Sequence, residues 1–381
     1  MSFAQAAAAY SLAATSINLA GLGIAGFRLR RPKAASPLLT ADNAPGVTII
    51  RPLCRINNFE RETLASTFTL DHPNFEILFC VEDEDDPVIG LVQGLIEAHP
   101  EVRAEVLIGR SGRTPNPKLN NCLKAWDAAS FDWIIMADSN VLMPPDYIQQ
   151  MMRRWQADSG LVCSMPIGTR PGNFGAELEC AFLNTFQARW QYVGEALGHG
   201  FAQGKSMLMR RELVDNAGGL LRALGTELAE DAAFTKLVRR AGLNVHLVDT
   251  PFAQPLGERR ISEVWSRQAR WAMLRRSTFP LMFAPEVLTG ALFPIIAGIA
   301  AAWAANVNVA VVAVGLFALW FGPELLLARR AGWFSSSRLL LACALRDCLF
   351  PVIWAYAWAR QDYVWRGNAV RVQPQMAEEL E

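Results

Sequence analysis

Two long uncharged stretches constrain this chain more than any other feature. No Asp, Glu, Lys or Arg occurs within residues 1–27 or within residues 287–323. About 20 apolar residues are enough for a helix to cross a bilayer. The first stretch therefore predicts one crossing helix, and the second predicts two, over residues 287–305 and 309–327. We expect an integral, multi-pass membrane protein.

Basic residues beside the first stretch predict whether it is cleaved off and how it is oriented in the membrane. Arg28, Arg30, Arg31 and Lys33 follow the apolar run directly, whereas a cleaved signal peptide carries its basic region before the run. We interpret residues 1–33 as an uncleaved anchor with a basic flank. Because Lys and Arg gather on the cytoplasmic side of membranes, the residues that follow are expected in the cytoplasm.

A third apolar stretch, residues 339–358, is harder to assign because Arg346 and Asp347 lie near its middle. Charges at mid-membrane depth are costly. The tail beyond the stretch is basic, which favours the cytoplasmic side, and a single crossing would place that tail outside. For the segment 331–381 the sequence therefore favours a re-entrant or interfacial helix and leaves a transmembrane helix open.

Overall composition excludes some classes of function. The formal net charge is +0, so nothing favours nucleic acid as a partner. The seven Cys residues are scattered, without a CxxC pair or the spacing of zinc ligands. We predict a reducing compartment, no disulfide framework and no nucleic-acid binding.

The middle of the chain, residues 46–258, alternates two kinds of pattern. Short apolar runs that are typical of strands occupy residues 46–53, 74–81, 104–110 and 132–137, with helical patterns between them. This alternation predicts an α/β domain with a parallel sheet covered by helices. Ligands of such domains bind at the carboxyl ends of the strands.

Acidic residues stand at three places where such a ligand would bind. Asp138 ends the fourth run, residues 82–86 follow the second, and Glu230 with Asp231 opens an apolar helix. Each of these carboxylates also fits an ordinary role as a helix cap or a solvated turn. A buried carboxylate needs a cation or hydrogen-bond donors beside it, so a partner is expected wherever one is buried.

Residues 259–284 are rich in Arg and Trp and lead into the predicted pair of transmembrane helices, residues 285–330. An amphipathic helix on the membrane surface is expected here. Arg267, Arg270 and Trp271 fall at positions i, i+3 and i+4, on one helix face. Two guanidinium groups placed in this way are suited to holding a diphosphate.

Taken together, these residues resemble the signature of membrane-bound inverting glycosyltransferases, which is written D…D…D…(Q/R)xxRW. Here it is Asp86, Asp138, Asp231 and the segment 267–271. The finer resemblance is to ceramide glucosyltransferases of a bacterial type. It covers residues 46–372, through segments such as NPKLNNCLKAWDAASFDWIIMADSNVLMPPD, LAEDAAF and SRQARWAMLR.

The resemblance implies a fold and a reaction. The expected fold is α/β, the GT-A fold of nucleotide-diphospho-sugar transferases with a Rossmann-like mixed sheet, flanked by N- and C-terminal transmembrane helices. The implied reaction moves a sugar, most often glucose, from a UDP-sugar to the primary hydroxyl of ceramide with inversion, in a bacterial inner membrane. A hopanoid or another membrane lipid as acceptor, and UDP-galactose, UDP-glucuronate or UDP-N-acetylglucosamine as donor, stay open. A non-catalytic binding scaffold on the same fold is the remaining alternative.

The resemblance also implies roles for single residues at the donor. Asp86, with Glu82 and the strand end at Pro52, would hold the uridine. Lys118 would lie near the diphosphate, and Asp138 would bind a Mg²⁺ or Mn²⁺ ion that bridges it. Many GT-A enzymes have Asp-x-Asp at this place, whereas this chain has Asp138-Ser139-Asn140, so weaker or different metal binding is expected.

The remaining roles concern catalysis. Asp231 would be the general base that takes the proton of the acceptor hydroxyl. Arg267, Arg270 and Trp271 would close on the diphosphate and shape the entrance for the acceptor. All of these roles require distant parts of the sequence to meet at one cytoplasmic pocket beside the membrane.

Overall fold

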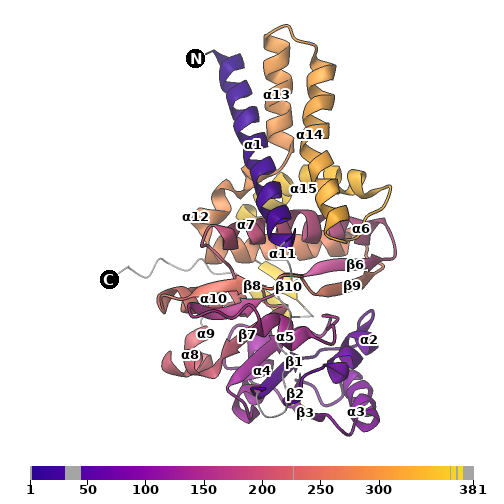
Figure 1. Ribbon diagram of the computed structural model, residues 1–381, viewed down its shortest axis with the longest axis vertical. Coiled ribbons are helices and arrows are strands. Elements are labelled where there is room, and N and C mark those ends of the chain that lie inside the picture. The colour runs from indigo at the N-terminus through magenta and orange to yellow at the C-terminus, as the bar shows by residue number, and fades with distance from the viewer. Residues whose placement is uncertain (1, 31–43, 226, 361, 366–367, 372–381) are drawn as a thin grey trace. The chain divides into compact units, whose positions relative to one another are not determined.

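The computed structural model describes residues 2–30, 44–225, 227–360, 362–365 and 368–371 (Figure 1). The chain divides into two compact units. We call residues 29–169 and 191–256 the α/β unit, and residues 1–28, 170–190 and 257–381 the helical unit. Residues 170–190 thus belong to the helical unit, although they lie inside the sequence range predicted for the α/β domain.

The α/β unit is built on a seven-stranded sheet with the strand order β3-β2-β1-β4-β7-β5-β8. Its strands are β1 (Val47–Pro52), β2 (Phe75–Val81), β3 (Arg103–Ile108), β4 (Trp133–Ala137), β5 (Ser159–Cys163), β7 (Ser206–Arg210) and β8 (Asn244–Leu247). Strands β3, β2, β1 and β4 are parallel to one another. Strand β7 runs antiparallel to both β4 and β5. Strands β5 and β8 are also parallel to each other. The sheet is therefore mixed, and its four-stranded parallel part, β3-β2-β1-β4, corresponds to the four runs that the sequence indicated.

Helices connect the strands of this sheet. They are α2 (Glu60–Ala65), η1 (Ser66–Thr69), α3 (Val88–Ala98), α4 (Pro117–Ala128), α5 (Tyr147–Met152), α7 (Arg189–Ala196), α8 (Arg211–Asn216), α9 (Leu220–Leu224) and α10 (Glu230–Arg240). Helix α4 starts where it does because the Asn116 side chain accepts a hydrogen bond from the Leu119 amide and Pro117 occupies the first turn. Both are common devices at a helix N-terminus.

The core of the α/β unit lies on both faces of the sheet. On one face, the clusters around Ile49 and Ile77, which are register partners in β1 and β2, are buried. On the other face, Ile50 and its register partner Leu78 are 0% and 4% exposed. Parallel strands that are covered on both faces need apolar side chains in both directions. This explains why the sequence shows continuous apolar runs there instead of an alternating pattern.

The helical unit contains α1 (Phe3–Arg30), α6 (Phe174–Cys180), the π-helix η2 (Ala181–Ala188), α11 (Ile261–Thr278), α12 (Pro280–Phe283), η3 (Ala284–Thr289), α13 (Leu292–Ala304), α14 (Val309–Arg330), α15 (Leu339–Ala359) and the hairpin β10 (Asp362–Trp365) and β11 (Asn368–Arg371). Strands β6 (Ile167–Pro171) and β9 (Ala253–Gly257) form a separate two-stranded sheet.

Three helices of the described residues are long and apolar enough to cross a membrane: Phe3–Leu29, Val309–Arg330 and Leu339–Ala359. The first two correspond to predicted spans. The predicted span 287–305 is interrupted, because Gly290 is extended (φ −89°, ψ 166°), and the segments Pro280–Thr289 and Leu292–Ala304 meet at an angle of 47°. These helices confirm the prediction of a membrane protein.

A polar stripe runs along the buried side of α1. Ser11, Thr15 and Asn18 are only 3%, 4% and 2% exposed. A Cβ atom at Gly298 of α13 would lie 2.8 Å from Ser11 Oγ and 2.3 Å from Leu316 Cδ1. Small and polar residues of this kind allow helices to approach closely in a membrane, so Gly298 permits α1, α13 and α14 to pack together.

Helix α15 is continuous across the two charged residues that made its path uncertain. Arg346 and Asp347 are 1% and 3% exposed. The Arg346 guanidinium donates to Asp347 Oδ1 at 2.7 Å, to Thr185 Oγ1 at 2.8 Å and to both carboxylate oxygens of Glu324 in α14. Because the charges are paired inside the helical unit, they do not interrupt the helix. Its length and composition support the transmembrane alternative for 339–359.

Candidate functional site

The sheet topology brings several predicted residues to one edge. Strand β1 lies between β2 and β4 and is parallel to both. The carboxyl ends of these strands are therefore neighbours. Pro52 ends β1, Glu82 follows β2, and Asp138 follows β4. Residues that are 30 to 86 positions apart thus reach one region because of the parallel pairing, as the sequence predicted.

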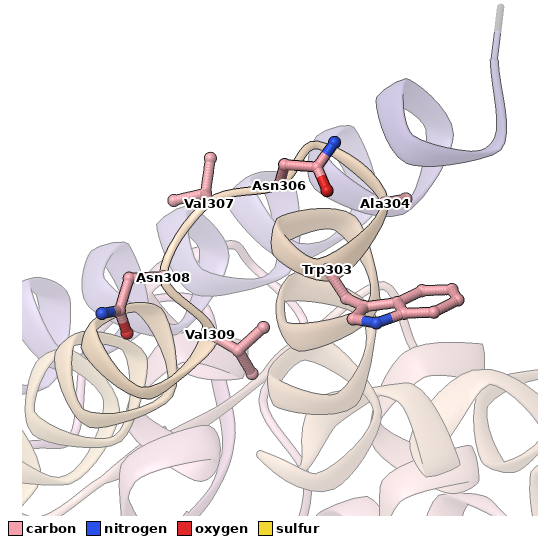
Figure 2. A pocket seen from close by; sticks show the side chains of 6 residues that line it. All are labelled: Trp303, Ala304, Asn306, Val307, Asn308 and Val309. Atoms are coloured by element: carbon pink, nitrogen blue, oxygen red, sulfur yellow. The ribbon is translucent and has the colours of Figure 1, made fainter.

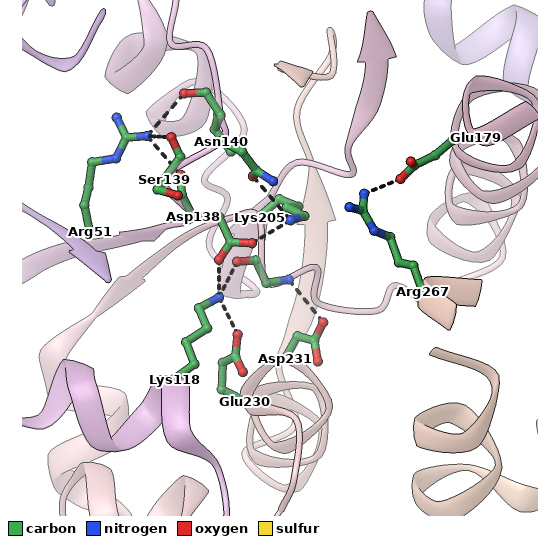
Figure 3. A network of polar contacts seen from close by, with 12 residues as sticks. Arg51, Lys118, Asp138, Ser139, Asn140, Glu179, Lys205, Glu230, Asp231 and Arg267 are labelled. Atoms are coloured by element: carbon green, nitrogen blue, oxygen red, sulfur yellow. Dashed lines mark hydrogen bonds and ion pairs between the residues drawn. The ribbon is translucent and has the colours of Figure 1, made fainter. Parts of the chain in front are cut away.

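The register between β4 and β7 places a lysine opposite Asp138. Ala137 pairs with Ser206 in this antiparallel ladder, and the Asp138 amide donates to the Lys205 carbonyl at 3.1 Å. The Lys205 Nζ lies 2.6 Å from Asp138 Oδ2 and 3.3 Å from Asn140 Oδ1 (Figure 3). Lys205 was not among the predicted site residues.

A second lysine contacts the other oxygen of the same carboxylate. Lys118, in the first turn of α4, lies 2.6 Å from Asp138 Oδ1 and 2.5 Å from Glu230 Oε1, and its Nζ donates to the Gly204 carbonyl at 2.8 Å (Figure 3). The three N–H groups of this ammonium thus have three acceptors. Burial alone would raise the pKa of Asp138, but Lys118 and Lys205 hold that pKa well below its usual range.

Asp231 has a different environment from its neighbour Glu230. Asp231 is half-buried, and its Oδ2 accepts from the Gly204 amide at 3.2 Å. Burial, and then the charge of Glu230, raise the pKa of Asp231 to about 6, against the opposing effect of Lys118. Glu230 instead forms the ion pair with Lys118 and accepts from Asn116 Nδ2 at 3.0 Å. Asp231 is therefore a carboxylate that can exchange a proton near neutral pH, as a general base must.

Arg51 is a buried cation that the sequence reasoning missed. It lies in β1 and is 0% exposed, and its Nη2 donates to the carbonyls of Asp138 and Ser139 at 2.9 and 2.8 Å (Figure 3). Burial lowers the pKa of Arg51 to about 10, so it is still charged at neutral pH. Its contacts hold the backbone that carries Asp138, and a lone Arg inside an apolar run was the available indication.

The predicted uridine residues have partners of their own. Asp86 Oδ2 accepts from the Arg55 amide at 2.7 Å, and its Oδ1 accepts from the Val88 amide at 2.9 Å. Asp86 therefore ties the turn after β1 to the start of α3. Glu82 lies 3.9 Å from Arg110 Nε, with its side chain 25% exposed. Roles of Pro52, Glu82 and Asp86 in holding a nucleotide stay predictions.

The motif of Arg and Trp lies in α11 of the helical unit. Arg267 Nη1 donates to Oε1 of Glu179, which is 0% exposed (Figure 3). Arg259 Nε lies 3.7 Å from the other carboxylate oxygen of Glu179. Arg270 and Trp271 are half-buried. These residues belong to a different unit from Asp138 and Asp231, and their predicted meeting at one pocket stays a prediction.

The residues around Asp138 offer few ligands for a divalent ion. No cluster of three or more His, Cys, Asp and Glu side chains suited to a metal occurs in the part of the chain that the structure describes. Asp138 and Asn140 supply one carboxylate and one amide oxygen. Sites of Mg²⁺ that bind nucleotides often use one or two carboxylates, with phosphates and water completing the shell. Asp138 and Asn140 therefore suit a divalent ion that binds together with a diphosphate, provided that the Lys205 ammonium moves away from them.

A second candidate site is a surface hollow at the α13–α14 turn. It is lined by Trp303, Ala304, Asn306, Val307, Asn308 and Val309 (Figure 2). Trp303 is 75% exposed and Val307 is 51% exposed. None of the lining side chains is ionisable, so this hollow offers no acid, base or cation for a reaction.

The chain was compared with known proteins. It matches the model of the family described as Glycosyl transferase family 21 over residues 8–377. Ceramide glucosyltransferase 1 of Caenorhabditis elegans is 30% identical over 264 residues, which cover 69% of this chain and 55% of the relative. Ceramide glucosyltransferase 3 of the same organism is 27% identical over 334 residues, which cover 85% of this chain and 72% of the relative. The chain thus matches about half the length of the first relative.

Among solved structures, a mannosyltransferase from Pyrobaculum calidifontis in complex with GDP-Man and Mn²⁺ is similar to this chain. The TM-score is 0.53 at 17% identity, and the alignment covers 90% of this chain and 99% of the other. At this identity the likeness concerns the fold alone. It confirms the predicted GT-A fold with its mixed sheet.

Proposed function

Because the chain belongs to glycosyl transferase family 21, we propose that it transfers a sugar from a nucleotide-diphosphate donor to a hydroxyl of a membrane lipid. The predicted resemblance to ceramide glucosyltransferases is confirmed by relatives of that name. These names support ceramide as the acceptor and glucose as the sugar. The finer proposal is UDP-glucose as donor, the primary hydroxyl of ceramide as acceptor, and inversion at the anomeric carbon.

One observation carries this proposal: Asp138 and Asp231, whose pKa values are shifted in opposite directions, are connected through Lys118 and Gly204. Asp138 is held ionised by Lys118 and Lys205, whereas Asp231 has a pKa of about 6. Lys118 donates to the Gly204 carbonyl, and the Gly204 amide donates to Asp231. Such a pair separates the two tasks of the reaction, which are holding cations and accepting a proton.

At the donor, Asp138 is proposed to hold the cations that face the diphosphate. A Mg²⁺ or Mn²⁺ ion bound there with Asn140 would neutralise the charge that develops as the nucleoside diphosphate leaves. Arg51 would keep Asp138 in place through the two carbonyl contacts. Pro52, Glu82 and Asp86 are proposed to hold the uridine, and Lys118 to lie near the diphosphate.

At the acceptor, Asp231 is proposed to take the proton of the lipid hydroxyl as its oxygen attacks the anomeric carbon. The bond between that carbon and the diphosphate oxygen breaks in the same step, so one base is sufficient and the configuration inverts. Arg267, Arg270 and Trp271 are proposed to stabilise the leaving diphosphate and to shape the acceptor entrance, since fixed donors lower the cost of its charge.

The proposed setting is the cytoplasmic face of a bacterial inner membrane. Three helices long enough to cross a bilayer support a membrane location. Basic residues follow α1 directly, which favours the cytoplasmic side for the residues after it. A lipid acceptor remains in the bilayer, so membrane attachment would keep the enzyme beside its substrate.

Turnover is tested with a panel of donors and acceptors. Membranes containing the full chain receive radiolabelled UDP-glucose, UDP-galactose, UDP-glucuronate or UDP-N-acetylglucosamine, together with ceramide or a hopanoid. Thin-layer chromatography is expected to show label from UDP-glucose on ceramide. Label on the hopanoid, or from another donor, would replace the ceramide or glucose assignment. Binding of UDP-sugars without any labelled lipid would overturn the enzyme proposal in favour of a scaffold.

Replacement of Gly204 tests how tightly this residue must fit beside Glu230 and Asp231. A Cβ atom there would lie 2.7 Å from Glu230 Oε1 and 3.4 Å from Asp231 Oδ2. We expect Gly204→Ala to lower kcat by about 100-fold, because misplacing groups by about 1 Å costs roughly that much. Gly90→Ala is the control, since nothing lies within 4 Å of its added Cβ atom. Equal kcat values for the two variants would contradict the assignment.

A further inference from the structure

We propose that Lys205 is a built-in cation of the Asp138 site. It competes with a divalent ion for Asp138 and Asn140, and it supplies a positive charge to the diphosphate of the donor. This inference rests on the proposed function for the identity of the donor. It concerns a residue outside the predicted signature and adds a means of regulating metal binding at that site.

Backbone pairing fixes where Lys205 lies. The pair Ala137 and Ser206 in the β4–β7 ladder places the next residues, Asp138 and Lys205, opposite one another. The hydrogen bond from the Asp138 amide to the Lys205 carbonyl extends this ladder. The two side chains therefore start from backbone positions that the sheet itself holds together. Their contact does not depend on a mobile surface loop.

The position of the ammonium resembles that of a metal ion. Lys205 Nζ lies between Asp138 Oδ2, at 2.6 Å, and Asn140 Oδ1, at 3.3 Å. These are the first and third residues of the Asp138-Ser139-Asn140 segment, where Asp-x-Asp would offer its two carboxylates. One carboxylate oxygen cannot bind an ammonium and a divalent ion in the same direction. Lys205 and the ion therefore exclude each other at Asp138 Oδ2.

The two lysines at Asp138 differ in what they hold. Lys118 connects three segments, because its contacts are Asp138, Glu230 and the Gly204 carbonyl. Lys205 contacts the Asp138-Ser139-Asn140 segment through Asp138 Oδ2 and Asn140 Oδ1. A flexible four-carbon stem allows a lysine ammonium to move while its backbone stays fixed. Lys118, which connects three segments, is suited to a fixed structural role. Lys205 is suited to move its ammonium from Asp138 toward a diphosphate.

Two consequences follow for binding. Without a nucleotide, a divalent ion must displace Lys205, so its affinity is weak. Without a metal, the nucleotide diphosphate still meets a cation at the end of β4, so its binding persists. Replacing Lys205 by an uncharged side chain of similar length should therefore strengthen the binding of a divalent ion without nucleotide and weaken the binding of nucleotide without a metal.

The experiment compares wild type with Lys205→Met, as full chains in detergent micelles. Electron paramagnetic resonance measures Mn²⁺ binding without nucleotide, and calorimetry measures UDP binding in the presence of EDTA. We expect Lys205→Met to bind Mn²⁺ at least about tenfold more tightly and UDP at least about tenfold more weakly, because a unit charge within 4 Å of the ligand is removed. Lys236→Met is the matched control, since Lys236 pairs with Glu227 at 2.6 Å, and it should change neither constant.

The outcomes separate the parts of the proposal. An unchanged Mn²⁺ affinity would overturn the competition, and an unchanged UDP affinity would overturn the diphosphate contact. If Lys205→Met does not elute as a folded protein, Lys205→Arg decides: it keeps the charge and should retain UDP binding in EDTA, and loss of that binding overturns the proposal. If no form of the chain binds UDP, the proposed donor fails, while the Mn²⁺ comparison still tests Lys205.

Discussion

Asp231→Asn is expected to lower kcat for sugar transfer by about 10²–10⁴-fold, the usual contribution of a general base. The amide has nearly the same shape as the carboxylate and keeps an oxygen that can accept from the Gly204 amide, at 3.2 Å in the native chain. The Kd of UDP should therefore change little. Turnover of a labelled UDP-sugar on the lipid acceptor and calorimetry of UDP measure the two quantities.

The pH profile distinguishes loss of a base from a structural defect. Because burial and Glu230 raise the pKa of Asp231 to about 6, the carboxylate is ionised above that pH and protonated below it. We expect kcat/KM of the wild type to fall about tenfold per pH unit below pH 6, since this ratio reports the free enzyme. In Asp231→Asn this acid limb should be absent. Asp215→Asn, at an exposed position of α8, should keep the wild-type rate and limb, and wild-type turnover in Asp231→Asn would refute the assignment.

The parallel part of the sheet could be predicted from sequence because its pattern is local. The apolar runs at 46–53, 74–81 and 132–137 contain the buried strands β1, β2 and β4, and the run at 104–110 overlaps β3, whose side chains are partly exposed. A strand buried on both faces leaves a continuous apolar run whatever its neighbours are. Asp138 could be recognised for the same reason, since a carboxylate directly after such a run lies at the ligand-binding edge.

The partners of Asp138 could not be predicted, because they depend on pairing between distant segments. Strand β7 enters the sheet antiparallel, between β4 and β5, and only its register places Lys205 at Asp138. Arg51 and Glu179 were missed for a similar reason, since each is a buried charged residue whose partners come from elsewhere in the chain.

The path of residues 339–359 depended on the same kind of distant pairing. Arg346 and Asp347 made a crossing costly as long as they were considered alone. Glu324 of α14 supplies the missing partner, and it is 0% exposed. Asp347 Oδ2 also accepts from the Ala291 amide at 2.8 Å. Hydropathy treats each charge as unpaired, so it overstates the cost of a charge that a neighbouring helix neutralises.

Arg346→Leu is accordingly expected to destabilise the chain by about 3–5 kcal/mol, the usual cost of removing one partner of a buried ion pair. The change leaves the carboxylates of Glu324 and Asp347 buried without their guanidinium, whose donors reach both. Thermal unfolding in detergent micelles should show a clearly lower midpoint. Arg260→Leu is the matched control, because Arg260 is 85% exposed and its partner Glu263 is 47% exposed, and exposed pairs contribute about 0–1 kcal/mol.

A double variant identifies the uncompensated charge as the cause. Replacing a buried ion pair with apolar residues of similar volume is often neutral or stabilising, so Arg346→Leu combined with Glu324→Leu should recover much of the lost midpoint. Recovery will be incomplete, because Asp347 loses its 2.7 Å contact with the Arg346 Nε. A double variant no more stable than Arg346→Leu would mean that packing of the Arg346 stem, and not the pairing of charge, holds α14 and α15 together.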